Sequence, residues 1–507
     1  MNGEDRLDAL LGPFRGVLTP FGTAVFCLLG WCLTAPLCPQ RLGSLALCWW
    51  GTALMLMAMQ VERPWLRVLP FPPLTVLAFY QWLHWPLGGM ILLLSPVGTG
   101  DVEAWSRSVH AALPLNAVFS TIVLGLGAIN AKWLRYQPQP QPIAEQGGGI
   151  SRRALLWLGL FTGVVAVGYG LVGFFSGTLD RGQANYMHWV FAFWRPDSLF
   201  IILLRLRDLY FVILPWLLWR WRQRPAVLLL FLLPTAMSLL LPALLGGRGL
   251  LIYPALLLLG GLWLAGAPPR PLRWGVLVTG LLAVVFIPLM MVTRNSPDFS
   301  VSKSTNLVAR IPVMLSVAGH LKLTEALPLL GRDLYAWSDP YLFREPALSS
   351  PPAGWKRVDR LRFLWIPRQL NPGRPDINDG HLVAKEIIGD LSLGTAGGRH
   401  YWFPGVSLEA DLYWRFRWFG VVFGGLIFGL FYAFISRFWY RFARLDGGLV
   451  SFLLALYPAT FLQGPPLRGL METIWVWGYE FPKYLLVFGV LVLLIRVLDH
   501  PWGQSSA

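Results

Sequence analysis

Long runs of apolar residues alternate with short polar stretches over most of this chain. A run of about 20 apolar residues is the length that an α-helix needs to cross the hydrocarbon core of a bilayer. A transmembrane β-barrel would instead show segments of about ten residues with alternating hydrophobicity, and the chain lacks that alternation. The pattern predicts an all-α polytopic membrane protein with about twelve transmembrane helices, at residues 18–37, 43–60, 75–95, 113–131, 154–176, 198–219, 226–246, 250–267, 274–293, 418–438, 449–463 and 484–498.

One long polar interval interrupts this pattern and divides the chain into three regions. Residues 1–293 are predicted to form a transmembrane region with about nine spans, and residues 418–507 a second with about three. Residues 294–417 lie between them as one large loop, in which 307–330 and 381–391 are predicted to form short helices. Loops of this length usually carry recognition or chemistry.

The distribution of positive charge predicts the orientation. The short loops on one side of the predicted spans hold seventeen Lys or Arg residues, and those on the other side hold seven. Because cytoplasmic loops collect Lys and Arg, we expect both termini inside the cell and the 294–417 loop outside it. Acidic residues near the N-terminus, and the lack of a small-residue cleavage site, indicate that the first apolar run is a retained span and not a signal peptide.

The composition supports a membrane protein and argues against other classes. The chain is 55% apolar and only 13% charged, and its net charge of +16 fits the attraction of cytoplasmic loops to anionic lipid head groups. No basic tail or zinc-ligand spacing supports nucleic-acid binding. The cysteines are interpreted as small packed residues, with a Cys38–Cys48 disulfide left open. The histidines share no ligand spacing, so neither a metal nor a cofactor is expected.

The sixth predicted span carries charges near its middle, where charge is expensive and by default functional. Arg205 and Asp208 are three residues apart and can pair on one helix face. Arg207 points elsewhere and is predicted to face a water-filled cavity or an anionic ligand. The alternative is a pair that only stabilises the helix bundle.

Two arginines at the predicted outer ends of spans could bind a phosphate or pyrophosphate. Arg248 lies in the turn Gly246-Gly247-Arg248-Gly249, where the glycines allow close approach by a ligand, and Arg294 ends the ninth span. Guanidinium groups bind phosphate oxygens bidentately, so together they could form a clamp. The alternative is a plain turn with an arginine anchored at the interface.

The end of the large loop concentrates polar and aromatic residues. Arg399 and His400 precede the aromatic cluster 401–403, and aromatic rings beside polar groups suit sugar stacking as well as a membrane-interface belt. Glu409 and Asp411 follow, and either could serve as a general base. The alternative is that these carboxylates pair with the arginines just after them, of which Arg415 is the first.

Two of these segments, in this order, resemble the bacterial O-antigen polymerase and ligase superfamily of membrane glycosyltransferases. Gly247-Arg248-Gly249 is similar to the small-residue–Arg–Gly sequence at the outer start of a mid-chain span. After the large loop, Asp411-Leu412-Tyr413, Phe416 and Gly420 resemble the Glu-Leu-Tyr, Asn-Phe-Gly and second Gly of the repeat-unit polymerases. The chain departs from that pattern at Arg415 and Arg417, which stand for its Asn and Gly, and Glu409-Ala410 stands for the His-Asn pair of the ligases.

The resemblance implies an enzyme of the bacterial inner membrane that polymerises polyprenyl-pyrophosphate-linked oligosaccharide repeat units into surface polysaccharide or exopolysaccharide. It implies transfer outside the cell from an undecaprenyl pyrophosphate donor, with a chain-length regulator and export proteins as partners to consider. Such a transfer needs a cationic clamp for the leaving group and a base for the acceptor hydroxyl.

We assign the clamp and the base as hypotheses on this chain's own residues. Arg248 and Arg294 would form the clamp, with Arg205, Arg207, Arg399 and Arg415 as further candidates for binding the pyrophosphate. Glu409 or Asp411 would be the base, with His400 in reserve. Because arginines can neutralise the pyrophosphate, we expect no metal. Alternative functions are ligase-type transfer of a glycan to a lipid, a lipid-linked sugar transporter or flippase, and a non-catalytic assembly factor.

Overall fold

The computed structural model describes most of the predicted membrane helices and part of the large loop. It covers residues 12–66, 72–95, 101–133, 152–175, 200–220, 249–265, 269–281, 339–364, 406–445 and 469–480, with short pieces or single positions between 226 and 236, 312 and 335, 366 and 400, and 482 and 497. The predicted span 449–463 therefore lies outside the described residues, as do most of the predicted span 226–246 and most of the predicted helix 307–330.

The described part of the chain is mostly helical, as predicted, and five of its segments are long and apolar enough to cross a membrane: Pro20–Leu37, Pro39–Val61, Pro73–Leu94, Ser108–Trp133 and Leu408–Arg441. They are built from the helices α2 (Pro20–Thr34), α3 (Leu42–Val61), α5 (Pro73–Trp82), α6 (Gly88–Leu94), α7 (Asp101–Trp133) and α19 (Leu408–Leu445), with the π-turn η4 (Leu83–Leu87) joining α5 to α6. These five segments coincide with five predicted spans, and their length and composition fit a multi-pass membrane protein.

The other elements are four apolar helices and several short ones. The apolar helices are α8 (Arg152–Phe175), α10 (Phe200–Arg220), α12 (Gly249–Leu264) and α13 (Pro269–Leu281). The short ones are η1 (Gly12–Leu18), η2 (Ala35–Leu37), η3 (Pro39–Arg41), α4 (Arg63–Leu66), η7 (Asp339–Phe343), η8 (Val358–Phe363), η9 (Val383–Ile388), α21 (Leu470–Trp475) and η11 (Val476–Glu480). A two-residue hairpin pairs β1 (Thr395–Ala396) with β2 (Arg399–His400).

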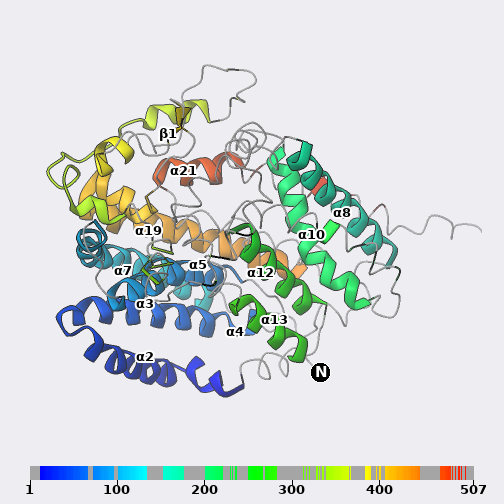
Figure 1. Cartoon of the computed structure of the whole chain (residues 1–507), viewed down its shortest axis with the longest axis horizontal. Helices are drawn as coiled ribbons and strands as arrows, with labels where there is room; N and C mark the ends of the chain where they lie inside the picture. The colour runs from blue at the N-terminus through cyan, green and yellow to red at the C-terminus, as the bar shows by residue number, and fades with distance from the viewer. Residues whose placement is uncertain are drawn as a thin grey trace, which may run out of the picture.

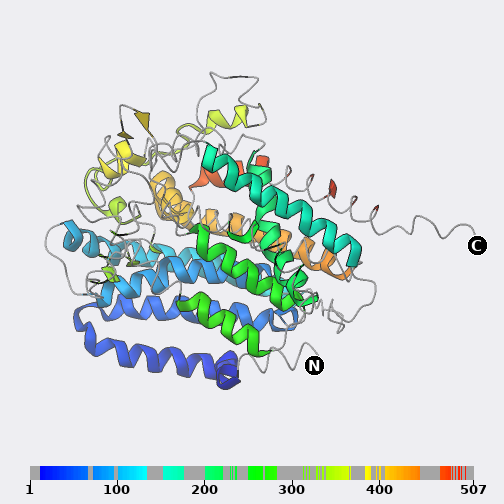
Figure 2. The ribbon, with the colours of Figure 1, turned by 45° about the vertical axis from the view of Figure 1, so that its right-hand side comes forward.

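The helices form two groups. In one, α2, α3, α7 and α19 pack in that order as successive layers, and α5 lies against α3 and α7 (Figure 2). In the other, α10 packs between α8 and α12, on the opposite side of the molecule from α2 (Figure 1). The layered group has a continuous apolar core to which α3, α5, α7 and α19 contribute, for example Leu54, Leu77, Phe119 and Phe428.

Helix α19 is bent sharply at Arg417, whose backbone dihedral angles are φ 56° and ψ −150°. The residues before the bend fold back on those after it, and two glycines make this possible. A Cβ on Gly420 would lie 2.4 Å from the carbonyl oxygen of Leu412, and one on Gly424 would lie 2.5 Å from the Leu412 side chain. The bend therefore requires the close approach that a residue without a side chain allows.

A second pair of glycines sets how closely α19 approaches α7. A Cβ on Gly425 would meet Phe119 at 3.4 Å, and one on Gly429 would meet Leu126 at 2.8 Å and the backbone of Val123 at 3.2 Å. Small residues four positions apart let helices pack closely in membranes, where van der Waals contact replaces the hydrophobic effect as the main driving force. Asn130 adds a hydrogen bond across this contact, from Nδ2 to the carbonyl oxygen of Ala433 at 2.9 Å.

The described part of the large loop packs on the first half of α19. Leu342, Val383 and Ile387 from the loop share an apolar cluster with Ala410 and Trp414 of α19. The predicted helix 381–391 is observed as the π-turn η9. The loop is therefore attached to α19 before the bend, above the layered group of helices (Figure 1).

The far end of α19 is tied to the start of α5 by a buried carboxylate. Glu62 follows α3 and accepts hydrogen bonds from the backbone N–H groups of Leu74, at 3.0 Å, and Thr75, at 2.6 Å. These are unpaired donors at the N-terminus of α5, a position that favours a negative charge. The hydroxyl of Tyr440 also donates to Glu62, and that of Tyr432 donates to the carbonyl oxygen of Pro73 at 2.6 Å.

We predict that Gly420→Ala destabilises the protein and that Gly425→Ala does not. The added methyl group at Gly420 meets backbone atoms that cannot move aside, whereas at Gly425 it makes ordinary contacts at 3.4 Å or more. We expect Gly420→Ala to cost about 1–3 kcal/mol. Thermal unfolding of the detergent-solubilised variants measures the difference, and equal melting temperatures would contradict the account of the bend.

We predict a pH dependence of stability that originates at Glu62. Burial raises the pKa of Glu62 from 4.5 to about 7, although hydrogen bonds from Tyr440, Thr75 and Leu74 favour its ionised form. The folded protein then holds more protons than the unfolded chain between these two values, so this group makes the free energy of unfolding fall as pH rises through that window.

Melting temperatures of the wild type and Glu62→Gln, compared across that pH range, test this prediction. The difference between the two should change through the window and stay constant above it. Glu386→Gln, which alters a partly exposed carboxylate, serves as the control and should follow the wild type. A constant offset between the wild type and Glu62→Gln at all pH values would show that Glu62 does not titrate there.

Candidate functional site

Five polar side chains from separate segments meet inside the layered group of helices, and we call them the polar cluster: His84, Asn116, Tyr335, Asp339 and Glu409. None is more than 1% exposed. His84 lies in the π-turn η4, Asn116 in α7, Asp339 at the start of η7 and Glu409 in the first turn of α19. Buried polar groups at membrane depth are costly and mark functional sites by default.

His84 stands between the two carboxylates of the cluster. Its Nε2 atom is 3.6 Å from Oδ2 of Asp339 and 3.7 Å from Oε1 of Glu409. On the other side of the ring, Nδ1 is 3.4 Å from the carbonyl oxygen of Leu334. This arrangement places one imidazole where it can share protons with two acids.

Asn116 and Tyr335 position Glu409 through a chain of two hydrogen bonds. Nδ2 of Asn116 donates to Oε1 of Glu409 at 3.0 Å, and the hydroxyl of Tyr335 donates to Oδ1 of Asn116 at 2.6 Å. Burial raises the pKa of Tyr335 well above its usual value, and the nearby acids add to this effect, so the hydroxyl stays a donor. The second oxygen of Glu409, Oε2, is buried and accepts no hydrogen bond within the described part of the chain.

The backbone around Glu409 is fixed by a capped helix start. The hydroxyl of Ser407 accepts a hydrogen bond from the N–H of Ala410 at 3.2 Å, which is the geometry of an N-cap. The N–H of Ser407 itself donates to Oδ1 of Asp339 at 2.8 Å. Asp339 therefore connects the large loop both to the start of α19 and to His84.

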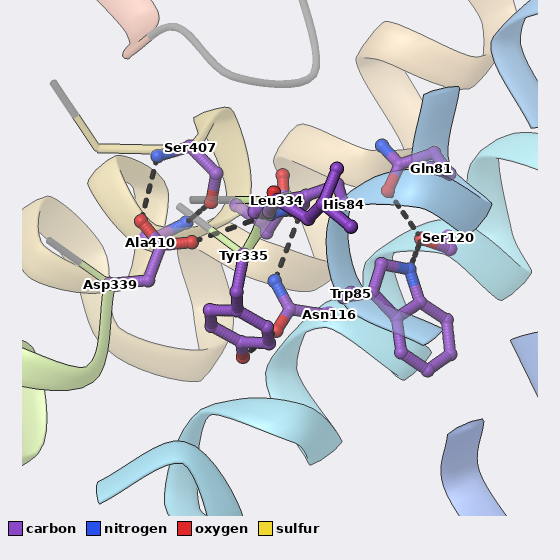
Figure 3. A network of polar contacts seen from close by, with 11 residues as sticks. Gln81, His84, Trp85, Asn116, Ser120, Leu334, Tyr335, Asp339, Ser407 and Ala410 are labelled. Carbon is purple, nitrogen blue, oxygen red and sulfur yellow. Dashed lines mark hydrogen bonds and ion pairs between the residues drawn. The ribbon is translucent and has the colours of Figure 1, made fainter. Parts of the chain in front are cut away.

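A neighbouring set of hydrogen bonds holds the π-turn in place. Nε1 of Trp85 donates to the hydroxyl of Ser120 at 2.9 Å, and that hydroxyl donates to Oε1 of Gln81 at 3.0 Å (Figure 3). Since Trp85 follows His84 directly, its attachment to α7 also fixes the imidazole. π-turns inside helices occur frequently at functional sites.

Asp411, the other candidate base, is occupied by a structural role. Its Oδ1 accepts from Nε of Arg415 at 3.0 Å and its Oδ2 accepts from the N–H of Leu470 at 2.6 Å. Arg415 is itself fully buried and also donates to the carbonyl oxygens of Gly354 and Lys356 at 3.1 and 2.9 Å. Asp411 and Arg415 thus join α19, the loop and α21, as the pairing alternative expected.

An apolar groove runs along α19 beside the polar cluster. It has a volume of about 720 Å³ and lies between α19 and the segment formed by α21 and η11. Leu408 and Leu412, which flank Glu409 in α19, belong to its lining, whereas none of the five residues of the polar cluster does. The groove suits a hydrocarbon chain and ends next to the polar cluster.

The remaining predicted site residues are only partly placed. Arg207 is buried in α10, with its guanidinium 5.9 Å from the ring of Phe211, in the helix group away from the polar cluster. The backbones of Arg205, in α10, and of Arg399 and His400, in β2, are described but their side chains are not. Arg248 and Arg294 lie outside the described residues, so the predicted clamp stays a prediction.

The structure adds four residues that sequence reasoning missed: His84, Asn116, Tyr335 and Asp339. His84 and Asn116 had a usable signal, because each is a polar residue inside a predicted span and such residues mark functional sites. Asp339 had none, since it is one of several acidic residues in a polar loop.

Comparison of the chain with family models, with curated proteins and with solved structures gives no match.

We predict that Asp411→Asn destabilises the fold, because it removes the charge that compensates the buried Arg415. Breaking a buried ion pair on one side costs about 3–5 kcal/mol. The matched control is Glu386→Gln, which breaks the partly exposed pair with Lys356 at 3.2 Å and should cost less than about 1 kcal/mol. Thermal unfolding of both variants provides the measurement, and equal losses would contradict the structural role of Asp411.

Proposed function

We propose that this protein is a glycosyltransferase that joins lipid-linked oligosaccharides in the membrane, with polymerisation of polyprenyl-pyrophosphate-linked repeat units as its reaction. The observation that carries the proposal is the polar cluster beside the apolar groove. The cluster offers proton transfer through Glu409 and His84, and the groove offers a place for the hydrocarbon part of a lipid-linked substrate. The resemblance in segments 247–252 and 411–420 supports the same reaction.

The chemistry requires a base at the acceptor hydroxyl. The acceptor oxygen forms a bond to the anomeric carbon of the donor sugar, and the bond from that carbon to the pyrophosphate oxygen breaks. The pyrophosphate leaves with the electron pair, and the acceptor proton passes to Glu409. Its Oε2 atom has no hydrogen bond to a described residue, so it can accept this proton, while Asn116 holds Oε1.

His84 and Asp339 have supporting roles in this proposal. The imidazole lies within 3.7 Å of both carboxylates and can carry the proton away from Glu409. Because Glu409 is fully buried, the acceptor reaches it only after the cover moves. Tyr335 and Asp339 belong to the large loop, so we infer that substrate binding displaces this loop from the cluster.

The membrane arrangement completes the proposal. We infer about twelve spans with both termini in the cytoplasm, the large loop outside, and a location in the bacterial inner membrane. Arg248 and Arg294 keep their proposed role at the pyrophosphate. The substrate partner is the lipid-linked oligosaccharide, and proteins that regulate chain length or export the product are further proposed partners.

A transporter for lipid-linked sugars is the second candidate. Buried His and carboxylate groups also line proton pathways in transporters, and the polar cluster fits that role. The two candidates differ in their products: an enzyme forms a new glycosidic bond, whereas a transporter moves unchanged substrate. If the acceptor is a different lipid, the same chemistry makes the protein a ligase.

We predict that Glu409→Gln abolishes transfer while the fold is kept, because the amide still accepts from Asn116 but cannot take a proton. The expected loss of rate is about 10²–10⁴-fold. The assay uses proteoliposomes with a polyprenyl-pyrophosphate-linked oligosaccharide and follows the length of the glycan product. Glu386→Gln is the control with an unchanged active site and should retain its rate. Full activity of Glu409→Gln would reject Glu409 as the base, and movement of unchanged substrate without a longer glycan would favour the transporter.

A further inference from the structure

Arg417 holds a backbone conformation that side chains rarely adopt. At φ 56° and ψ −150° it lies in a region occupied almost only by glycine, inside a helix that is otherwise regular. A glycine would hold this backbone conformation with less strain than the arginine does.

The guanidinium of Arg417 has no acidic partner within the described residues. Its Nη2 atom donates to the carbonyl oxygen of Ser350 at 2.6 Å, and the group lies 5.5 Å from the centre of the Tyr413 ring. The contrast is with Arg415, two residues earlier, which is fully buried against Asp411. Arg417 is half-buried and keeps its positive charge available.

The chain on both sides of Arg417 forms one end of the apolar groove. Phe416 and Phe419 line it, and so does Trp355, which packs edge-on against Phe416 at 4.8 Å and is 70% exposed. The same loop segment contains Ser350, the partner of Arg417. Arg417 itself does not line the groove, but its backbone lies between Phe416 and Phe419, which do, and its partner Ser350 precedes Trp355 in the same loop segment. The cation therefore lies beside this end of the groove.

Beyond the bend, the groove follows one face of α19. Its lining there recurs every three or four residues, from Phe419 through Phe423 to Phe431, and on the other wall it runs from Leu470 to Gly478. The part of α19 from Phe419 to Phe431 extends for about 18 Å at 1.5 Å per residue. Ile427 lines it and is 69% exposed, so the strip borders the surface of the protein within the membrane span.

We propose that Arg417 binds the phosphate of an amphiphile whose single hydrocarbon chain lies in this groove. The occupant is a lipid that carries a phosphate or pyrophosphate on one long chain, since the groove is apolar along its length and Arg417 provides a cation beside one end of it. Guanidinium groups bind phosphate oxygens with two parallel hydrogen bonds. The inference rests on the proposed function, because such a lipid would carry the donor sugar.

Binding of farnesyl pyrophosphate to the detergent-solubilised protein, measured by calorimetry, tests the proposal. We expect farnesyl pyrophosphate to bind at least about 10-fold more tightly than farnesol or inorganic pyrophosphate, because only the first engages both the cation and the groove. Arg417→Gly should weaken its binding by about 10-fold or more without loss of melting temperature, because glycine suits the backbone. Arg417→Lys should retain part of the affinity.

Two further variants separate binding of the phosphate group from binding of the lipid's hydrocarbon chain. Ile474→Trp adds bulk to the groove and should weaken farnesyl pyrophosphate and farnesol alike. Arg362→Gln removes an exposed arginine of η8, which does not line the groove, and should change neither. Equal binding by the wild type and Arg417→Gly would overturn the proposal, and so would competition by the two-chain lipid phosphatidylglycerol as strong as that by farnesyl pyrophosphate.

This experiment can fail independently of the proposed function. Glu409→Gln should bind farnesyl pyrophosphate as the wild type does, because binding needs no proton transfer. Intact binding in a protein that makes no glycosidic bond would reject the transferase and keep the lipid site. Transfer that persists unchanged in Arg417→Gly would reject the lipid site and keep the transferase.

Discussion

The buried ion pair between Asp411 and Arg415 is the contact on which the arrangement of the whole site depends. It connects three parts of the chain that are distant in sequence: the first half of α19, the loop around Gly354 and the start of α21. If these parts were not joined, Glu409 would lose its position beside His84 and the groove would lose one wall. A charge pair of this kind contributes geometry more than net stability, because its desolvation offsets most of its attraction.

Two requirements with opposite solvent preferences meet along α19. Proton transfer needs acids and an imidazole shielded from bulk water, and a lipid chain needs an apolar surface without polar atoms. The bend at Arg417 allows one helix to serve both, because the residues before it contact the loop and the polar cluster, and residues on both sides of the bend line the groove. Gly420 and Gly424 permit this division by letting Leu412 pack directly against the helix.

The sequence was sufficient for the helical class and for the positions of the first four long apolar segments, because runs of 20 apolar residues have few alternative structures. It also located Glu409 and Asp411 at the end of the loop, but it could not separate their roles. That distinction depends on Leu470 and Gly354, whose backbone groups reach Asp411 and Arg415 only in the folded chain. Asp339 could not be found for the same reason, since its partners His84 and Ser407 are distant from it in the sequence and meet it only in the folded chain.

The π-turn at residues 83–87 makes the site depend on chain length as well as on residue type. A π-turn contains one residue more than the α-helical turn it replaces, and each residue rotates a helix by about 100°. Deletion of one residue other than His84 between Trp82 and Gly88 would keep every side chain of the polar cluster. The helices on the two sides of the deletion would then be rotated relative to each other, and the imidazole would no longer face Glu409. Related chains that share this site should therefore conserve the spacing from Gln81 to Gly88, even where the apolar residues between them differ.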